Sequence, residues 1–177
     1  MILPEQTARV DSQFIYQPLW SDCLLLLEAC EKRGARYYMI SGYRPIPEQD
    51  GLYAQGRTKP GQIVTNAKGG QSYHNQGIAI DFCRDKDMAR AGLQPGWAPE
   101  DYQILAEESQ RFKTLESGFF WTFKDPPHIQ WRLPPGVDLF RQKHNVPTAV
   151  LQEINPDGSK LKDVFAFLNG QSSLVRS

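Results

Sequence analysis

The first clear hydrophobic pattern of the chain has the period of an α-helix. Four apolar residues between positions 19 and 34 follow one another at i, i+3, i+4 and i+7, as one buried helix face requires. Ser21 or Asp22 can cap the start, and Gly34 can end the helix in the left-handed conformation. We therefore predict a helix over residues 19–34, and its apolar stripe consists of Cys23, Leu26, Leu27 and Cys30.

The next fifty residues give strand, helix and loop signals in turn. Residues 36–41 are rich in aromatic and β-branched side chains, which favours a strand. Pro47 can open a short helix that stops near Gly56. Glycine and proline then punctuate residues 56–72, which predicts a long loop. A loop of this length inside a compact domain is unusual unless it has a role such as shaping a binding cleft.

Residues 77–83 alternate between large apolar side chains and small or acidic ones. Ile78 and Ile80 then point to one face and Asp81 to the other, which predicts a half-buried strand. The spacing from His74 to Asp81 also fits two turns of a helix. The glycine and the β-branched residues between them favour the strand.

The second half of the chain predicts one more long helix, from Pro99 to about Leu115. Short strands are predicted at residues 119–123 and 128–132, on either side of a Pro-Pro turn. Short helical patterns recur after residue 145, separated by proline and glycine.

Length and composition exclude several classes of protein. The chain has 177 residues, 40% of them hydrophobic and 23% charged, as in an ordinary soluble domain. Twenty basic and twenty acidic residues leave no net charge, which argues against a nucleic-acid partner. No apolar run has the length of a membrane span, and the N-terminus lacks the pattern of a secretory signal. We expect a monomer made in the cytosol without a leader and without membrane insertion.

The cysteines predict no disulfide framework. Cys23, Cys30 and Cys83 are an odd number without CxxC spacing, so free buried thiols are the favoured interpretation.

Two of the three histidines lie in segments suited to hold a metal ion. His74 precedes the predicted strand that carries Asp81, and His128 begins another predicted strand. Two imidazoles and one carboxylate are three of the ligands of a catalytic zinc, whose fourth position is left for water. A single histidine is more often a structural or surface residue than a ligand. The prediction of a zinc hydrolase therefore depends on the three residues together.

Two charged residues are candidates for the chemistry around such a metal. Asp125 lies three residues before His128 in Asp-Pro-Pro-His, and the prolines make a stiff extended link that suits a general base. The alternative is an ordinary Asp-Pro turn. Arg44 follows the predicted strand at residues 36–41, where a guanidinium could stabilise an oxyanion. Taken alone, it is a surface arginine.

Other nucleophilic chemistries fit less well. Ser72 and His74 lack an acid that would orient the histidine for a serine nucleophile. Cys83 follows an apolar strand and has no activating group nearby in the sequence. The remaining histidine, His144, lies in a polar stretch and is expected to be exposed.

Several of these motifs occur together in the order and spacing of a known family. They are Ser41-Gly-Tyr-Arg44, Ser72-x-His74-Asn-x-Gly77-x-Ala79-x-Asp81 and Asp125-x-Pro127-His128. From about residue 20 to residue 132 the chain resembles the L-alanyl-D-glutamate peptidases. These are peptidoglycan endopeptidases of phage endolysins and bacterial wall enzymes, related to D-alanyl-D-alanine carboxypeptidases and dipeptidases.

The resemblance implies an α+β fold of the D-alanyl-D-alanine peptidase or Hedgehog-like kind. In this fold a small antiparallel sheet carries the zinc site and helices pack against the sheet. The implied reaction is cleavage of the peptidoglycan stem peptide between L-Ala and D-Glu. The implied roles are zinc binding for His74, Asp81 and His128, acid/base catalysis for Asp125, polarisation of the carbonyl or stabilisation of the oxyanion for Arg44, and lining of the substrate cleft for Ser72.

Two other functions remain open on the same residues. One is a D,D-carboxypeptidase or dipeptidase on this scaffold, because the segment 118–124 is shorter than the family's usual approach to the catalytic acid. The other is a non-catalytic binding module stabilised by zinc. We assign residues 1–144 to the catalytic domain and residues 145–177 to a helical extension packed on it. Without a leader, the enzyme would reach the wall through holin-type release or with a virion.

Overall fold

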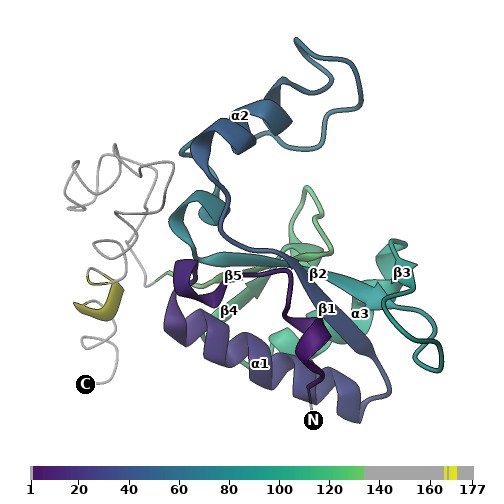
Figure 1. The fold of residues 1–177 in the computed structure, drawn as a ribbon. Helices are drawn as coiled ribbons and strands as arrows, with labels where there is room; N and C mark the ends of the chain where they lie inside the picture. Colours follow the sequence, from purple (N-terminus) through teal and green to yellow (C-terminus); the bar gives the residue numbers. More distant parts are fainter. Residues whose placement is uncertain (1, 134–165, 167, 171–177) are drawn as a thin grey trace. The chain divides into compact units, whose positions relative to one another are not determined.

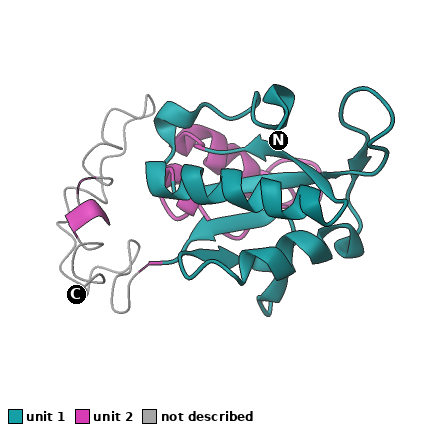
Figure 2. Ribbon diagram, turned by 90° about the horizontal axis from the view of Figure 1, so that it is seen from below, with its two compact units in different colours: residues 1–42, 78–132 teal, residues 43–77, 133–177 magenta. Residues whose placement is uncertain are grey.

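The computed structural model describes residues 2–133, 166 and 168–170 of the chain. The chain divides into two compact units, which Figure 2 shows in teal and magenta. Unit 1 consists of Met1–Gly42 and Ile78–Arg132, and unit 2 consists of Tyr43–Gly77 and Leu133–Ser177. Each unit is described by itself.

Unit 1 contains a five-stranded sheet in which every pairing is antiparallel. The strand order is β1-β2-β5-β4, and β3 pairs with β2. The expected α+β class with a small antiparallel sheet is therefore confirmed (Figure 1). The strands are β1 Arg36–Ser41, β2 Ala79–Asp85, β3 Pro95–Gly96, β4 Leu115–Ser117 and β5 His128–Trp131.

Helices α1, Gln17–Lys32, and α3, Gln103–Ser109, pack against each other and against the sheet. The predicted apolar stripe of α1 is confirmed, because its four residues and Leu19 are fully buried. The helix begins two residues earlier than predicted, after Tyr16. Pro18 lies in the first turn, where its fixed φ suits a helix start. Neither Ser21 nor Asp22 caps the helix, since both lie inside it.

The end of α1 follows the prediction. Arg33 is the last half-helical residue, and Gly34 has a φ of 75°. A residue without Cβ adopts this left-handed conformation at no steric cost, which is why glycine often follows a helix. The chain then enters β1 directly, so the predicted strand at 36–41 is confirmed with its bounds.

β2 lies between β1 and β5, and it is buried more deeply than its sequence indicated. Ala79 and Cys83 are as fully buried as Ile80, while Asp81 is intermediate. The predicted strand is therefore confirmed, at Ala79–Asp85, but it is mostly buried on both faces and not half-buried. The alternation in the sequence is one of side-chain size, and small apolar residues fill a buried face as readily as large ones do.

Two predictions in the second half were also wrong. The long helix predicted from Pro99 to about Leu115 is instead a 3₁₀ turn, η4 Pro99–Tyr102, followed by the short helix α3. Leu115 begins the strand β4. The aromatic segment 119–123 is not a strand. It begins with the 3₁₀ turn η5, Gly118–Phe120, where the Ser117 hydroxyl accepts a hydrogen bond from the Phe119 amide. β4 ends just before this turn, because its pairing with β5 runs from Leu115 opposite Trp131 to Ser117 opposite Ile129. The two-residue strand β3 was not predicted.

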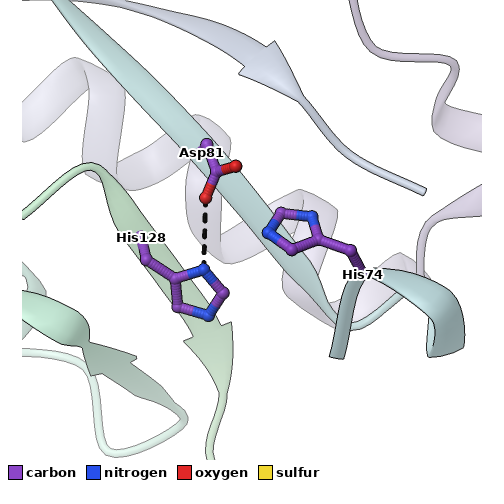
Figure 3. A group of neighbouring side chains, drawn as sticks. All are labelled: His74, Asp81 and His128. Carbon is purple, nitrogen blue, oxygen red and sulfur yellow. Dashed lines mark hydrogen bonds and ion pairs between the residues drawn. The ribbon is translucent and has the colours of Figure 1, made fainter. Parts of the chain in front are cut away.

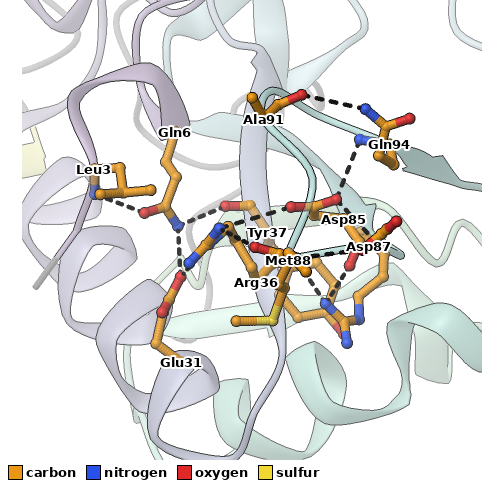
Figure 4. A network of polar contacts seen from close by, with 12 residues as sticks. Leu3, Gln6, Glu31, Arg36, Tyr37, Asp85, Asp87, Met88, Ala91 and Gln94 are labelled. Carbon is orange, nitrogen blue, oxygen red and sulfur yellow. Dashed lines mark hydrogen bonds and ion pairs between the residues drawn. The ribbon is translucent and has the colours of Figure 1, made fainter.

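A polar network joins the N-terminal segment to α1 and to one end of β1 and β2 (Figure 4). The fully buried Gln6 side chain donates to the Tyr37 carbonyl at 2.9 Å. Arg36 donates to Glu31 at 2.9 Å. Asp85, also fully buried, accepts from the amides of Asp87 and Gln94 at 3.2 and 3.1 Å, which fixes the loop that leads to β3.

Unit 2 contains α2, Ile46–Ala54, with Pro47 in its first turn as predicted. The long loop predicted at 56–72 is confirmed, since it contains turns and bends and no helix or strand. The loop packs on α2 through the buried Gln49, which donates to the Ala67 carbonyl at 2.8 Å. The guanidinium of Arg57 lies 4.0 Å from the centre of the Tyr53 ring and donates to the Thr65 carbonyl. A 3₁₀ helix, η3 Tyr73–Gln76, ends the unit's first segment.

The remaining expectations concern the cysteines, membrane-spanning helices and the C-terminal residues. The three cysteines are free and buried, as predicted. Among the described residues no helix has both the length and the apolar character needed to cross a bilayer. The predicted extension at 145–177 and His144 lie outside the described residues, except for helical residues at 166 and 168–170.

Candidate metal centre

His74, Asp81 and His128 come together in the structure (Figure 3). They come from η3, β2 and β5. One ligand atom of each lies within 4.8 Å of the ligand atoms of the other two. His74 and His128 are buried and Asp81 is partly exposed. The structure therefore groups the three residues that the sequence singled out.

Asp81 and His128 are held together by sheet pairing. They are partners in the register of β2 and β5, so their side chains lie on the same face of the sheet. Asp81 Oδ1 lies 3.1 Å from His128 Nδ1. The other ring nitrogen, Nε2, lies 3.1 Å from Oε1 of Gln130. Trp121 flanks the same ring, with centroids 5.1 Å apart.

The charges around His128 favour its protonated form. Burial by itself lowers the pKa of this imidazole. The hydrogen bond to Asp81 and the negative charges of Asp81 and Asp125 outweigh burial, so the net pKa is raised above its ordinary value. A site that stabilises a proton between an imidazole and a carboxylate also presents the negative potential that attracts a cation.

His74 is held by a short turn whose ends are both capped. The Ser72 hydroxyl accepts a hydrogen bond from the His74 amide at 3.3 Å. Gly77 ends the turn with a φ of 66°, a left-handed conformation that costs a residue with a Cβ more. The spacing Ser-x-His-x-x-Gly is therefore the sequence of a capped 3₁₀ turn. His74 thus lies in this turn, which precedes β2.

The turn is attached to the segment that carries Arg44. The Arg44 amide donates to the His74 carbonyl at 3.1 Å. The buried Asn75 side chain donates to the Arg44 carbonyl at 2.7 Å and accepts from the Gly70 amide at 2.9 Å. Asn75 is thus a positioning residue that we did not predict, although it lies inside the motif. The two motifs that contain Arg44 and His74 meet through these bonds.

The guanidinium of Arg44 is oriented by α2. Its Nη1 donates to Oε1 of Gln49 at 2.8 Å, and its Nε lies 3.9 Å from Glu48. Gln49 is fully buried and also donates to Thr65 at 3.3 Å. Arg44 is therefore not the freely moving surface arginine that was the alternative. Its role toward a substrate stays a prediction, as does the lining of a cleft by Ser72.

Asp125 begins a turn that ends at His128. The His128 amide donates to the Asp125 carbonyl at 3.1 Å, so Asp-Pro-Pro-His is a hydrogen-bonded turn rather than the predicted extended link. Pro126 lies at the second position of this turn, where its fixed φ is favourable, so the alternative of an Asp-Pro turn is the one observed. The Asp125 side chain is exposed. Its negative charge nevertheless contributes to the raised pKa of His128.

Gly118 fixes the other side of this turn, and the sequence did not reveal it. The Asp125 amide donates to the Gly118 carbonyl at 3.0 Å. A Cβ at Gly118 would lie 2.5 Å from the Asp125 carbonyl oxygen and 3.1 Å from its Cβ. Only a glycine permits this approach. The aromatic segment between Gly118 and Asp125 is thereby closed into a loop next to the cluster.

The donor set fits a single divalent metal ion. Two ligands about 2.0–2.1 Å from a tetrahedral metal are separated by about 3.3 Å, close to the 3.1 Å between Asp81 Oδ1 and His128 Nδ1. Three protein ligands leave one position for water or substrate, which is the arrangement of catalytic rather than structural sites. The fold and the site together are those of a small α+β domain with three side chains that could hold one metal ion.

Comparison with known proteins gives the family. Residues 14–130, well over half of the chain, match the family described as VanY, D-alanyl-D-alanine carboxypeptidase, and the chain belongs to this family. The chain is also similar to the peptidoglycan L-alanyl-D-glutamate endopeptidase CwlK of Bacillus subtilis, with 43% identity over 117 residues. That match covers 59% of this chain and 66% of the relative. The family resemblance read from the motifs is confirmed.

Two solved structures are similar at lower identity. One is the crystal structure of the L-Ala D-Glu endopeptidase ChiX of Serratia marcescens, with 17% identity and a TM-score of 0.42 over 73% of this chain and 92% of that one. The other is a mutant of the vancomycin-resistance D,D-pentapeptidase VanY from a VanB-type cassette, in complex with Zn(II). It has 22% identity and a TM-score of 0.47 over 69% of this chain and 72% of that one.

Proposed function

We propose that this chain is a zinc-dependent peptidase that cuts the stem peptide of peptidoglycan at the L-Ala–D-Glu bond and acts at the cell wall. The observation that carries the proposal is the grouping of His74, Asp81 and His128, with Asp125 one turn before a ligand. Membership of the VanY family supports a peptidase. The similarity to CwlK, with 43% identity over 117 residues, supports the particular bond.

Zinc is the metal that best suits the three ligands. Two imidazoles and one carboxylate are a common catalytic zinc set, whereas magnesium and calcium prefer oxygen ligands alone. When bound there, zinc supplies a Lewis acid and lowers the pKa of a water to about 7. His74, Asp81 and His128 would hold it.

The other residues have roles that follow from their surroundings. Asp125 is exposed and lies at the start of a rigid turn, so it can accept a proton from water and later return it to the leaving amine. Arg44 is held by the buried Gln49, and a guanidinium fixed in this way can stabilise the oxyanion of the tetrahedral intermediate. Ser72 supports the turn of His74 and, in this proposal, also faces the substrate.

A D,D-carboxypeptidase is the second candidate, and the description of the matched family favours it. The two activities differ in their products. A carboxypeptidase shortens stem peptides by terminal D-Ala, whereas an L-Ala–D-Glu endopeptidase creates new L-Ala C-termini and D-Glu N-termini. Mass spectrometry of digested wall fragments separates them.

The test measures zinc content and wall digestion on one preparation, with and without a chelator. We expect about one zinc per chain, held by the cluster found among the described residues, and chelator-sensitive release of fragments with new L-Ala ends. His128→Ala should lose both zinc and activity, because it removes one of three ligands. Zinc without any release would favour the non-catalytic binding module. Absence of zinc, or stoichiometric metal in His128→Ala, would contradict the site.

A further inference from the structure

Both ring nitrogens of His128 have hydrogen-bond partners. Nδ1 faces Asp81 Oδ1 at 3.1 Å, on the side of the three-residue cluster. Nε2 faces Gln130 Oε1, also at 3.1 Å. Gln130 follows His128 by two residues in β5, so the two side chains lie on the same face of the strand. Gln130 is buried, with 4% of its surface exposed.

The chemistry of an amide gives this contact a direction. A carbonyl oxygen can only accept a hydrogen bond, so with the Gln130 amide in this orientation Nε2 of His128 is the donor. A neutral imidazole has one N–H, and which nitrogen carries it is set by the hydrogen bond that the ring makes. With the proton on Nε2, the lone pair is on Nδ1. This is the nitrogen beside Asp81.

We propose that Gln130 is a positioning residue that sets the tautomer and the ring orientation of His128, so that Nδ1 is the atom offered to the metal. The inference goes beyond the proposed function but depends on one part of it, the binding of a metal by His74, Asp81 and His128. Groups that accept a hydrogen bond from a ligand histidine orient its ring and raise the basicity of its other nitrogen. Gln130 is the described residue in that place.

A second contact limits the movement of the ring in another direction. The Trp121 ring lies against His128, tilted by 46°. Trp121 is itself fixed, since its Nε1 donates to Glu116 Oε1 at 2.7 Å. Glu116 is the cross-strand partner of Gln130 in the pairing of β4 with β5. Gln130 thus accepts a hydrogen bond from Nε2 of the imidazole, while the tilted Trp121 ring packs against the same imidazole.

The test uses two variants of Gln130 and one matched control. Gln130→Leu removes the acceptor at similar size, and Gln130→Glu keeps an acceptor at the same place. Gln6→Leu is the control, because Gln6 is also a buried glutamine with a side-chain hydrogen bond, to the Tyr37 carbonyl, and has no contact with the cluster. Zinc affinity is measured by competition with a chelator, and the protonated ring nitrogen by long-range ¹H–¹⁵N spectra of zinc-loaded protein.

We expect zinc affinity to fall about 10–100-fold in Gln130→Leu, the range known for such supporting groups. Gln130→Glu should recover most of the affinity. Gln6→Leu should lower the melting temperature and leave zinc affinity unchanged. In the wild type, the spectrum should show His128 protonated on Nε2 and coordinated through Nδ1. With only three histidines in the chain, the signals can be assigned by single replacements.

Several results would overturn the inference. One is coordination of wild-type His128 through Nε2, and another is unchanged zinc affinity in Gln130→Leu. The third is an equal loss of zinc affinity in Gln6→Leu, because that would mean a general loss of structure. The wild-type spectrum decides even if Gln130→Leu does not fold. A wild type that binds zinc with the expected spectrum but does not digest wall peptides would contradict the proposed function and leave the role of Gln130 intact. A wild type without zinc would contradict both.

Discussion

At the scale of single residues, replacement of Asp125 tests catalysis separately from metal binding. Its carboxylate is exposed and is not part of the group His74, Asp81 and His128. We expect Asp125→Ala to keep its zinc and to lose at least ~100-fold in the rate of stem-peptide hydrolysis, since a general base contributes about that much or more. Zinc content and turnover are measured together. Asp87→Ala, which removes another exposed carboxylate in the loop after β2, serves as the control and should keep its activity. Retained activity in Asp125→Ala would remove this residue from the mechanism.

Gln76 has a polar side chain in a buried position. It is fully buried, and neither polar atom of its side-chain amide has a hydrogen-bond partner among the described residues. A buried amide without a partner destabilises a protein by about 1–3 kcal/mol. Gln76→Met has a similar length and no such group, so it should raise the free energy of unfolding by an amount in this range. Chemical denaturation measures it. An unchanged or lower stability would mean that the amide has a favourable contact.

At the scale of elements, Gly118 connects η5 to the turn that carries Asp125. A methyl group at Gly118 would overlap the Asp125 carbonyl oxygen. We expect Gly118→Ala to displace this turn and to lower stability by roughly 1–3 kcal/mol, as overpacking usually does. The activity should fall as well, because the displaced residue is the proposed base. Thermal denaturation and the hydrolysis rate are the measurements.

The same substitution elsewhere provides the control. Gly51 lies within α2, and a Cβ there would meet nothing within 4 Å. Gly51→Ala should therefore stabilise the helix slightly, since alanine has a higher helix propensity than glycine. If both alanine variants behaved alike, the close approach at Gly118 would have no functional meaning.

At the scale of the whole molecule, burial makes the three thiols unreactive. Burial raises the pKa of Cys23, with a further contribution from Asp22, and it raises the pKa of Cys30 to about 12. Burial also raises the pKa of Cys83. A raised pKa means that the reactive thiolate is scarce at pH 8. We expect slow reaction with a thiol reagent in the folded protein and rapid reaction of all three thiols in denaturant. Rapid reaction of one thiol under native conditions would show local opening near it.

Local properties of the sequence were sufficient for several elements and for the choice of candidate ligands. The apolar stripe of α1 and the left-handed Gly34 follow from interactions within a few residues. The ability to bind a metal is a chemical property of the side chains of His74, Asp81 and His128, so their selection as candidates needed no knowledge of the fold. Their confirmed grouping in space agrees with the spacing of the motifs.

Only the tertiary structure decided the features that depend on distant partners. The aromatic segment after Ser117 has the composition of a strand, but pairing of Leu115 with Trp131 places β4 before it. The contacts of Gly118 with Asp125, of Gln49 with Arg44 and of Gln130 with His128 are visible only in the structure. Whether a side chain can bind a metal depends on its own chemistry. Its orientation depends on which neighbours the fold brings to the other side of the ring, and that is determined by the packing of the whole sheet.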